Sequence, residues 1–307
     1  MTARRIALWG LVLLWGWSGF LPARAADRSN PRGGLDGGSS SREARQRAVE
    51  ALPVDSMSDA GRHAVEECLR RTTLYRRLPT ATIGCDAALL DFVLAKPETL
   101  VDVWRVLGIS RLTLDPTGPG QWRLADGYGT AGSVRLLHRE RNDRGGLYVF
   151  HGRGGYSGPL SPRDLSGSCV ILVRYARAVP DDDGRPRQTV QIDAFLDVDG
   201  LGLEIVTRTL QPLIVRSAAA NLHEIGLFVS QFAAAAARNP AGVARLADRM
   251  TRTKPEDRQA LVARAGGSRA TPMRDGGLGD DAVQAELAAR WLPADEAAIA
   301  GAWQPGR

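Results

Sequence analysis

Apolar residues recur at helical spacing in the first third of the chain. Helices are predicted over Ser58–Arg70, Asp86–Ala95 and Pro97–Leu107. Ser58 suits the N-cap of the first helix, because its hydroxyl can accept a hydrogen bond from a backbone N–H of the first turn. Proline suits the first position of the third helix, where no N–H donor is needed. Gly108 then ends this helical part of the chain.

From Ile109 onward apolar and polar residues alternate, which is typical of strands with one buried face. Turns rich in Gly, Pro, Asn and Asp divide the alternating runs and favour antiparallel hairpins between them. Six strands are predicted: Ser110–Leu114, Gln121–Leu124, Ser133–Arg139, Leu147–His151, Cys169–Arg177 and Val190–Val198.

A long helix follows the strands, from Pro212 to Arg238. Its apolar residues step by four, three and four, which forms one continuous stripe. The stripe consists of Ile214, Ala218, Leu222, Ile225, Val229, Phe232 and Ala236. At 1.5 Å per residue the helix is roughly 40 Å long, enough to cross a sheet. The predicted fold class is α+β: a curved antiparallel sheet of about six strands, with N-terminal helices and one long C-terminal helix packed across it.

The first 26 residues have the three parts of a secretory signal peptide. Arg4 and Arg5 precede the apolar run Ile6–Leu14, and Ala23–Ala25 forms a small-residue cleavage site. The run is shorter than the roughly 20 residues of a membrane-spanning helix. We therefore expect cleavage, export to the periplasm, cell envelope or exterior, and no integral membrane segment in the mature chain.

The rest of the chain is expected to form one domain with polar flanks. Residues 27–56 are predicted to be a Gly/Ser-rich linker with one short charged helix from about Arg42 to Ala51. Residues 57–250 form the predicted α+β domain. Residues 251–307 are polar and broken by glycine pairs, which predicts a poorly ordered tail.

Charge and motifs exclude several classes of protein. Loss of the signal peptide lowers the formal charge from +6 to +3, and no basic block interleaves with aromatic residues. Nucleic acid is therefore not an expected partner. No C-x-x-C or H-x-x-x-H spacing occurs, so neither a metal site nor a cofactor is predicted. The glycine-rich segment His151–Gly158 lacks the lysine of a phosphate-binding loop and is interpreted as a hairpin loop.

The three cysteines allow one disulfide in an exported chain. Cys68 and Cys85 flank Thr72–Pro79, which is interpreted as a connector between two helices. We expect a bond between these two cysteines. It would stabilise the fold by about 3 kcal/mol on the chain-entropy model. Cys169 begins an apolar strand and is expected to be a small buried side chain.

The order of helices, antiparallel strands and one long helix resembles the helix-grip fold of START-like proteins, the superfamily of polyketide cyclases and lipid-transfer domains. The resemblance covers roughly residues 97–237. Proteins of this family open with a strand, and no strand is predicted here before the helices. The chain also looks like uncharacterised exported bacterial proteins with W-x-x-L-G-I-S and D-G-x-G-T, here Trp104–Ser110 and Asp126–Thr130. That second resemblance implies no known activity.

A curved sheet gripped by one helix leaves an apolar hollow, and such hollows bind apolar ligands. The candidate lining residues are Trp104, Tyr128, His138, His151, Ile225 and Phe232. The leading hypothesis is an exported, non-catalytic binding or carrier protein for an apolar small molecule or lipid. One alternative is an envelope structural or interaction protein whose own side chains fill the hollow. The other is an enzyme that uses Tyr128, His138 or His151.

Overall fold

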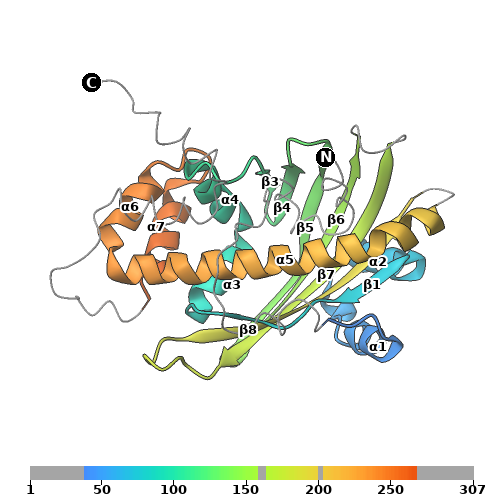
Figure 1. Ribbon diagram of the computed structural model, residues 1–307, viewed down its shortest axis with the longest axis horizontal. Helices are drawn as coiled ribbons and strands as arrows, with labels where there is room; N and C mark the ends of the chain where they lie inside the picture. The colour runs from blue at the N-terminus through green and yellow to red at the C-terminus, as the bar shows by residue number, and fades with distance from the viewer. Residues whose placement is uncertain (1–37, 158–163, 200–202, 268–307) are drawn as a thin grey trace.

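The computed structural model describes residues 38–157, 164–199 and 203–267 (Figure 1). In these ranges the chain forms seven α-helices and one sheet of eight strands, an α+β fold as predicted. The helices are α1 (Arg42–Glu50), α2 (Asp59–Arg71), α3 (Ala87–Ala95), α4 (Pro97–Val106), α5 (Leu203–Arg238), α6 (Pro240–Asp248) and α7 (Pro255–Ala265), and a 3-10 turn spans Val54–Ser56. The strands are β1 (Leu74–Arg77), β2 (Ala81–Ile83), β3 (Thr113–Gly118), β4 (Gln121–Ala125), β5 (Thr130–Asn142), β6 (Gly145–Tyr156), β7 (Leu165–Ala178) and β8 (Arg187–Val198). The predicted signal peptide lies outside the described residues.

The sheet is antiparallel throughout, in the order β1-β8-β7-β6-β5-β4-β3, with β2 also paired to β8. Figure 1 shows α5 crossing one face of this sheet, with α1 and α2 against the other. We call these the α5 face and the α2 face. Side chains alternate along each strand: on β7, Ile171 and Val173 pack on the α5 face, whereas Val170 and Leu172 pack on the α2 face.

Local sequence signals account for most of these elements. The Ser58 hydroxyl accepts a hydrogen bond from the Gly61 N–H, and Pro97 begins α4, which confirms both predicted helix starts. All six predicted strands are present. β3 begins later than predicted and continues through Pro116, because an edge strand tolerates a residue that cannot donate to a neighbour.

Helix α5 is longer than the sequence indicated. It begins at Leu203 and passes through Pro212, which was expected to start it. Among its described side chains, the predicted stripe is confirmed: Ala218, Leu222, Val229, Phe232 and Ala236 are buried, and Ile225 is half-buried. No helix among the described residues is both long and apolar enough to span a membrane.

The segment interpreted as a connector is instead part of the sheet. Leu74–Arg77 forms β1, and Ala81–Ile83 forms β2; both pair with β8. Strands of four and three residues are too short for alternation to be recognised in sequence. Their place is set by β8, more than a hundred residues later in the chain.

The predicted Cys68–Cys85 disulfide is wrong, because the sheet separates the two thiols. Cys68 packs with α1 and α2 on the α2 face, and Cys85 lies in the core on the α5 face. The prediction treated the intervening residues as a loop, whereas they form β1 and β2 at the sheet edge. Cys169 is buried, as expected.

Both flanks of the domain are more ordered than predicted. Ala44 and Ala48 of α1 are buried against the α2 face, so the short helix of the expected linker belongs to the domain. In the expected tail, α7 buries Leu261 and Ala265. The Asp102 carboxylate accepts hydrogen bonds of 2.9 Å from the backbone N–H and the hydroxyl of Thr253. These contacts fix the chain ahead of α7; residues 268–307 lie outside the described residues.

Candidate ligand site on the face crossed by the long helix

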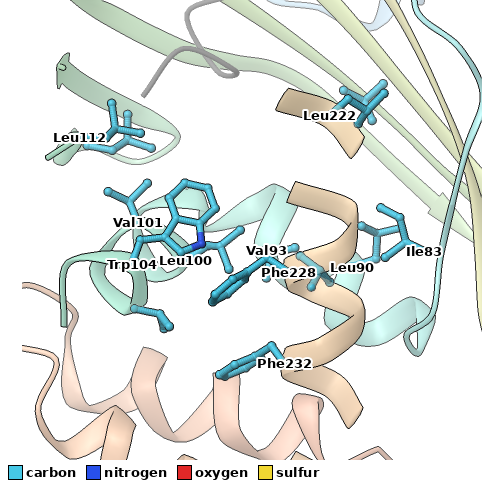
Figure 2. Close-up of a cluster of buried hydrophobic side chains, with 14 of the residues drawn as sticks. Ile83, Leu90, Val93, Leu100, Val101, Trp104, Leu112, Leu222, Phe228 and Phe232 are labelled. Carbon is cyan, nitrogen blue, oxygen red and sulfur yellow. The ribbon is translucent and has the colours of Figure 1, made fainter. Parts of the chain in front are cut away.

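Three of the six predicted lining residues lie on the α5 face. Trp104 and Phe232 are 4% and 1% exposed, and Ile225 is half-buried. Figure 2 shows Trp104 of α4 beside Phe228 of α5, with Phe232 one helical turn further on. The Trp104 and Phe228 rings meet edge to face at 5.9 Å, and the Phe228 and Phe232 rings stack at 6.2 Å. We call this aromatic group the packed end of the α5 face, since its own side chains fill it.

The other three predicted residues do not join them. Tyr128 lies in the turn before β5, 39% exposed, with the Arg111 guanidinium 5.7 Å from its ring. His138 pairs with Val149 and His151 pairs with Val170, and both valines belong to the core on the α2 face. The histidines are therefore diagonal neighbours across β5 and β6, as the sequence suggested, but on the face away from α5.

His151 is held in its neutral form. Burial, followed by the charges of Arg135 and Arg153, lowers its pKa from 6.5 to about 4. A group with this pKa is uncharged at neutral pH and is a weak base there. With its position on the α2 face, this removes His151 from the candidate site on the α5 face.

A row of glycines marks one part of the α5 face. Gly132 of β5, Gly154 of β6 and Gly167 of β7 lie in register, and the row continues to the buried Val198 of β8. A Cβ on Gly154 would lie 2.6 Å from the Ala131 carbonyl oxygen. Glycine in a strand marks such a close approach of backbones or a bend in the sheet.

At this glycine row (Gly132, Gly154 and Gly167), three adjacent strands have no side chain on the α5 face. The next row along β6 has Gly152 between Val134 and Cys169, both buried. The α5 face therefore has two unlike regions: a packed end filled by aromatic rings, and a row where three adjacent strands contribute glycine.

A polar cluster lies on the same face, where α3 meets β5 and β6. Asp91 of α3 is only 4% exposed. Its carboxylate accepts hydrogen bonds from the Tyr148 hydroxyl, from Arg139 Nη2 at 2.5 Å and from Arg141 Nη1 at 3.2 Å. The Arg139 guanidinium also lies 5.8 Å from the centre of the Tyr148 ring. A buried carboxylate needs such partners, because an isolated buried charge is costly.

A β-bulge brings the two arginines to this face. The register of β5 against β6 shifts between Leu136 and His138, so that Arg139 stands opposite Tyr148. A bulge adds one residue to one strand and reverses the alternation beyond it. The sequence pattern of β5 predicted unbroken alternation to Arg139, so neither arginine was identified as part of a site.

Tyr175 of β7 completes the group, which we call the Asp91 cluster (Asp91, Arg139, Arg141, Tyr148 and Tyr175). Its ring lies over Gly146, where a Cβ would come within 2.6 Å of Cε1. The Tyr175 hydroxyl is buried and makes no hydrogen bond. Burial, followed by the nearby charge of Asp91, raises the pKa of Tyr175 to about 12. Burial and the Asp91 hydrogen bond also raise the pKa of Tyr148.

A related group on the α2 face is more completely enclosed. Asp193 of β8 is fully buried and accepts hydrogen bonds from the Tyr75 hydroxyl at 2.6 Å, Arg77 Nε at 2.8 Å and Arg174 Nη2 at 2.6 Å. These contacts tie β1 to β8 and β7. Burial and the Asp193 hydrogen bond raise the pKa of Tyr75. This group therefore has a structural role at the sheet edge.

Comparison with known proteins assigns neither a family nor an activity. No protein-family model matches the chain. No curated protein matches it either. Among solved structures, the Mll3558 protein from Rhizobium loti is similar at 18% identity with a TM-score of 0.26, covering 48% of this chain and 97% of that one. An uncharacterised protein from Rhizobium leguminosarum is similar at 15% identity with a TM-score of 0.23, covering 49% and 98%.

Proposed function

We propose that this protein binds an apolar, lipid-like ligand between α5 and the sheet, over the glycine row. The observation that carries the proposal is the contrast within the α5 face. One end is filled by Trp104, Phe228 and Phe232, whereas three adjacent strands leave the glycine row without side chains. Apolar ligands bind in largely preformed hollows lined by hydrophobic groups.

The order of the elements supports a START-like carrier. Such folds open with a strand before their short helices, and β1 and β2 precede α3 and α4 here. Both pair with β8, the last strand before the long helix. This order supports a helix-grip arrangement, in which the ligand lies between the long helix and the sheet.

Three ionisable groups of the α5 face are better suited to binding than to catalysis. The pKa values of Tyr148, Tyr175 and Cys85 are all raised, the last two to about 12. Such groups stay protonated at neutral pH, whereas efficient acid–base catalysts have a pKa near the working pH. They are suited to donating hydrogen bonds and to packing. With the secretory signal expected in the sequence, we infer a carrier that works outside the cytoplasm.

A structural or interaction protein with a filled core is the second candidate. The packed end favours it, because Phe228 and Phe232 are 0% and 1% exposed and their rings stack on each other beside Trp104. The two candidates differ in what lies over the glycine row: a ligand in the first, and the protein's own side chains in the second.

Titration with the neutral apolar probe N-phenyl-1-naphthylamine separates them. The carrier should bind the probe saturably, and Cys169→Trp, beside the glycine row, should abolish binding while the protein still unfolds cooperatively. Arg153→Trp is the matched control, because this side chain is exposed on the same strand as Gly154. The carrier proposal fails if the original protein binds no probe and Cys169→Trp unfolds the domain. Unfolding would show that the larger side chain has no space beside the glycine row, as expected for a filled core.

A further inference from the structure

The Asp91 cluster has more hydrogen-bond donors and more positive charge than its single carboxylate can satisfy. Two guanidinium groups face one carboxylate, which leaves one positive charge. The side chains of Arg139 and Arg141 are 44% and 57% exposed, so both reach solvent while Asp91 stays buried. Each guanidinium presents five N–H donors in a fixed fork. Both arginines donate to the same oxygen, Oδ2 of Asp91.

The group around Asp193 on the α2 face provides an internal comparison. It also has one carboxylate and two arginines, yet each arginine has a second acceptor. Arg77 Nη2 donates to the Ala44 carbonyl at 3.3 Å, and Arg174 Nη2 donates to Gln191 Oε1 at 3.0 Å. Their side chains are 15% and 30% exposed, less than those of Arg139 and Arg141. The two arginines of the Asp91 cluster are therefore more exposed to solvent than those around Asp193, and among the described residues they lack a second hydrogen-bond acceptor of that kind.

Tyr175 adds an independent observation. Its residue is 4% exposed, and its buried hydroxyl makes no hydrogen bond. A buried hydroxyl without a partner costs free energy, because it has given up its hydrogen bonds to water and gained none in the protein. The hydroxyl lies near Asp91, whose oxygens already accept from Tyr148 and from the two arginines. An oxygen-bearing ligand would supply the missing acceptor.

We propose that Arg139, Arg141 and Tyr175 bind an anion, a carboxylate or a phosphate group. Arginine pairs favour these anions because the planar guanidinium matches two oxygens at once. Asp91 holds the arginines in place and offsets one of their charges, so a ligand with one or two negative charges completes the cluster. The anion is either a free small molecule or the headgroup of a larger one. This site does not depend on the apolar ligand, because it lies at the rows of Tyr148 and Gly146, six and eight residues along β6 from Gly154 of the glycine row.

Calorimetric titration at constant ionic strength tests the site with three probes: inorganic phosphate, dodecanoate and the neutral 1-dodecanol. The variants are Arg141→Gln, Tyr175→Phe and the control Arg123→Gln, which removes an exposed arginine from β4. Arg141→Gln should weaken anion binding at least tenfold and Tyr175→Phe several-fold. The control should bind as the original protein does. Cooperative unfolding of every variant verifies that it is folded.

The pattern across probes identifies the source of the anion. Saturable phosphate binding that depends on Arg141 indicates a free anion. Dependence on Arg141 with dodecanoate alone indicates a headgroup. The proposal is overturned if Arg141→Gln and Arg123→Gln bind both anions equally, or if neither anion binds the original protein. Binding of 1-dodecanol reports only on the proposed apolar ligand, so either proposal can fail without the other.

Discussion

Arg139 of β5 donates a hydrogen bond of 2.5 Å to the carboxylate of Asp91 in α3, joining two residues 48 positions apart. Tyr148 donates to the same carboxylate from the neighbouring strand. These contacts hold α3 on the sheet and keep a buried charge paired. The stability of the domain should therefore depend on the side chains that donate to Asp91. It should not depend on the hydroxyl of the neighbouring Tyr175, which makes no hydrogen bond.

Tyr148→Phe should lower the free energy of unfolding by about 2 kcal/mol, the usual range for a buried hydrogen bond to a charged group. Tyr175→Phe is the matched control, because its hydroxyl makes no hydrogen bond, and it should leave the free energy of unfolding unchanged or raise it. Urea denaturation of the two variants measures the difference. Equal losses in both variants would show that the Tyr148 hydroxyl is not specifically coupled to Asp91.

Phe232→Ala should cost about 3–5 kcal/mol of stability, the range for truncating a large buried aromatic side chain. Phe232 is 1% exposed and stacks on Phe228, so its removal leaves a cavity at the packed end. Ile225→Ala, on the same helix but half-buried, should cost less. Chemical denaturation is the measurement. A loss of unfolding free energy below about 1 kcal/mol for Phe232→Ala would contradict the close packing of the packed end.

His151 should make stability fall in mildly acidic solution. Its folded-state pKa is about 4 against an ordinary value of 6.5, so between these pH values the unfolded chain binds a proton that the folded chain does not. The free energy of unfolding therefore falls as the pH drops below about 6.5, and the loss reaches at most about 3 kcal/mol near pH 4. His151→Gln removes this pH-dependent contribution to stability. The difference in unfolding free energy between the two proteins should therefore change with pH over this window, and a constant difference would contradict the assignment.

The thiols of Cys68 and Cys85 should react slowly in the folded protein. Burial raises both pKa values to about 12, and each thiol is enclosed in a different core. The thiolate is the reactive form, so labelling with a disulfide reagent at pH 8 should require unfolding. A reductant should leave the unfolding midpoint unchanged. A lowered midpoint in reductant would instead indicate a disulfide.

Local sequence patterns predict the parts of this fold whose signal is local. The stripe of α5 and the alternation along β7 and β8 each extend over ten or more residues, so their periods are clear. The two short strands β1 and β2 carry no such period and depend on pairing with β8. The position of helix α7 likewise depends on a distant residue. The backbone N–H of Arg252, just ahead of α7, donates a hydrogen bond to the carboxylate of Asp102, 150 residues earlier in the chain.

The candidate site was harder to predict for the same reason. The bulge before His138 reverses which side chains of β5 face α5, so alternation alone assigns Arg139 and Arg141 to the wrong face. Asp91 reads as an ordinary polar position of a short helix until β5 and β6 are placed against it. His151 shows the opposite error: its chemistry suggested a site, while the register of β6 places it on the α2 face.

The most direct test of the proposed carrier is protein-detected nuclear magnetic resonance during titration with 1-dodecanol. In the proposed carrier, the backbone amide signals of Gly132, Gly154 and Gly167 should shift saturably, because the proposed ligand lies over these residues. The amide signals of α1, on the α2 face, should stay in place. Glycine signals that do not move saturably, or shifts confined to other parts of the chain, would contradict the carrier.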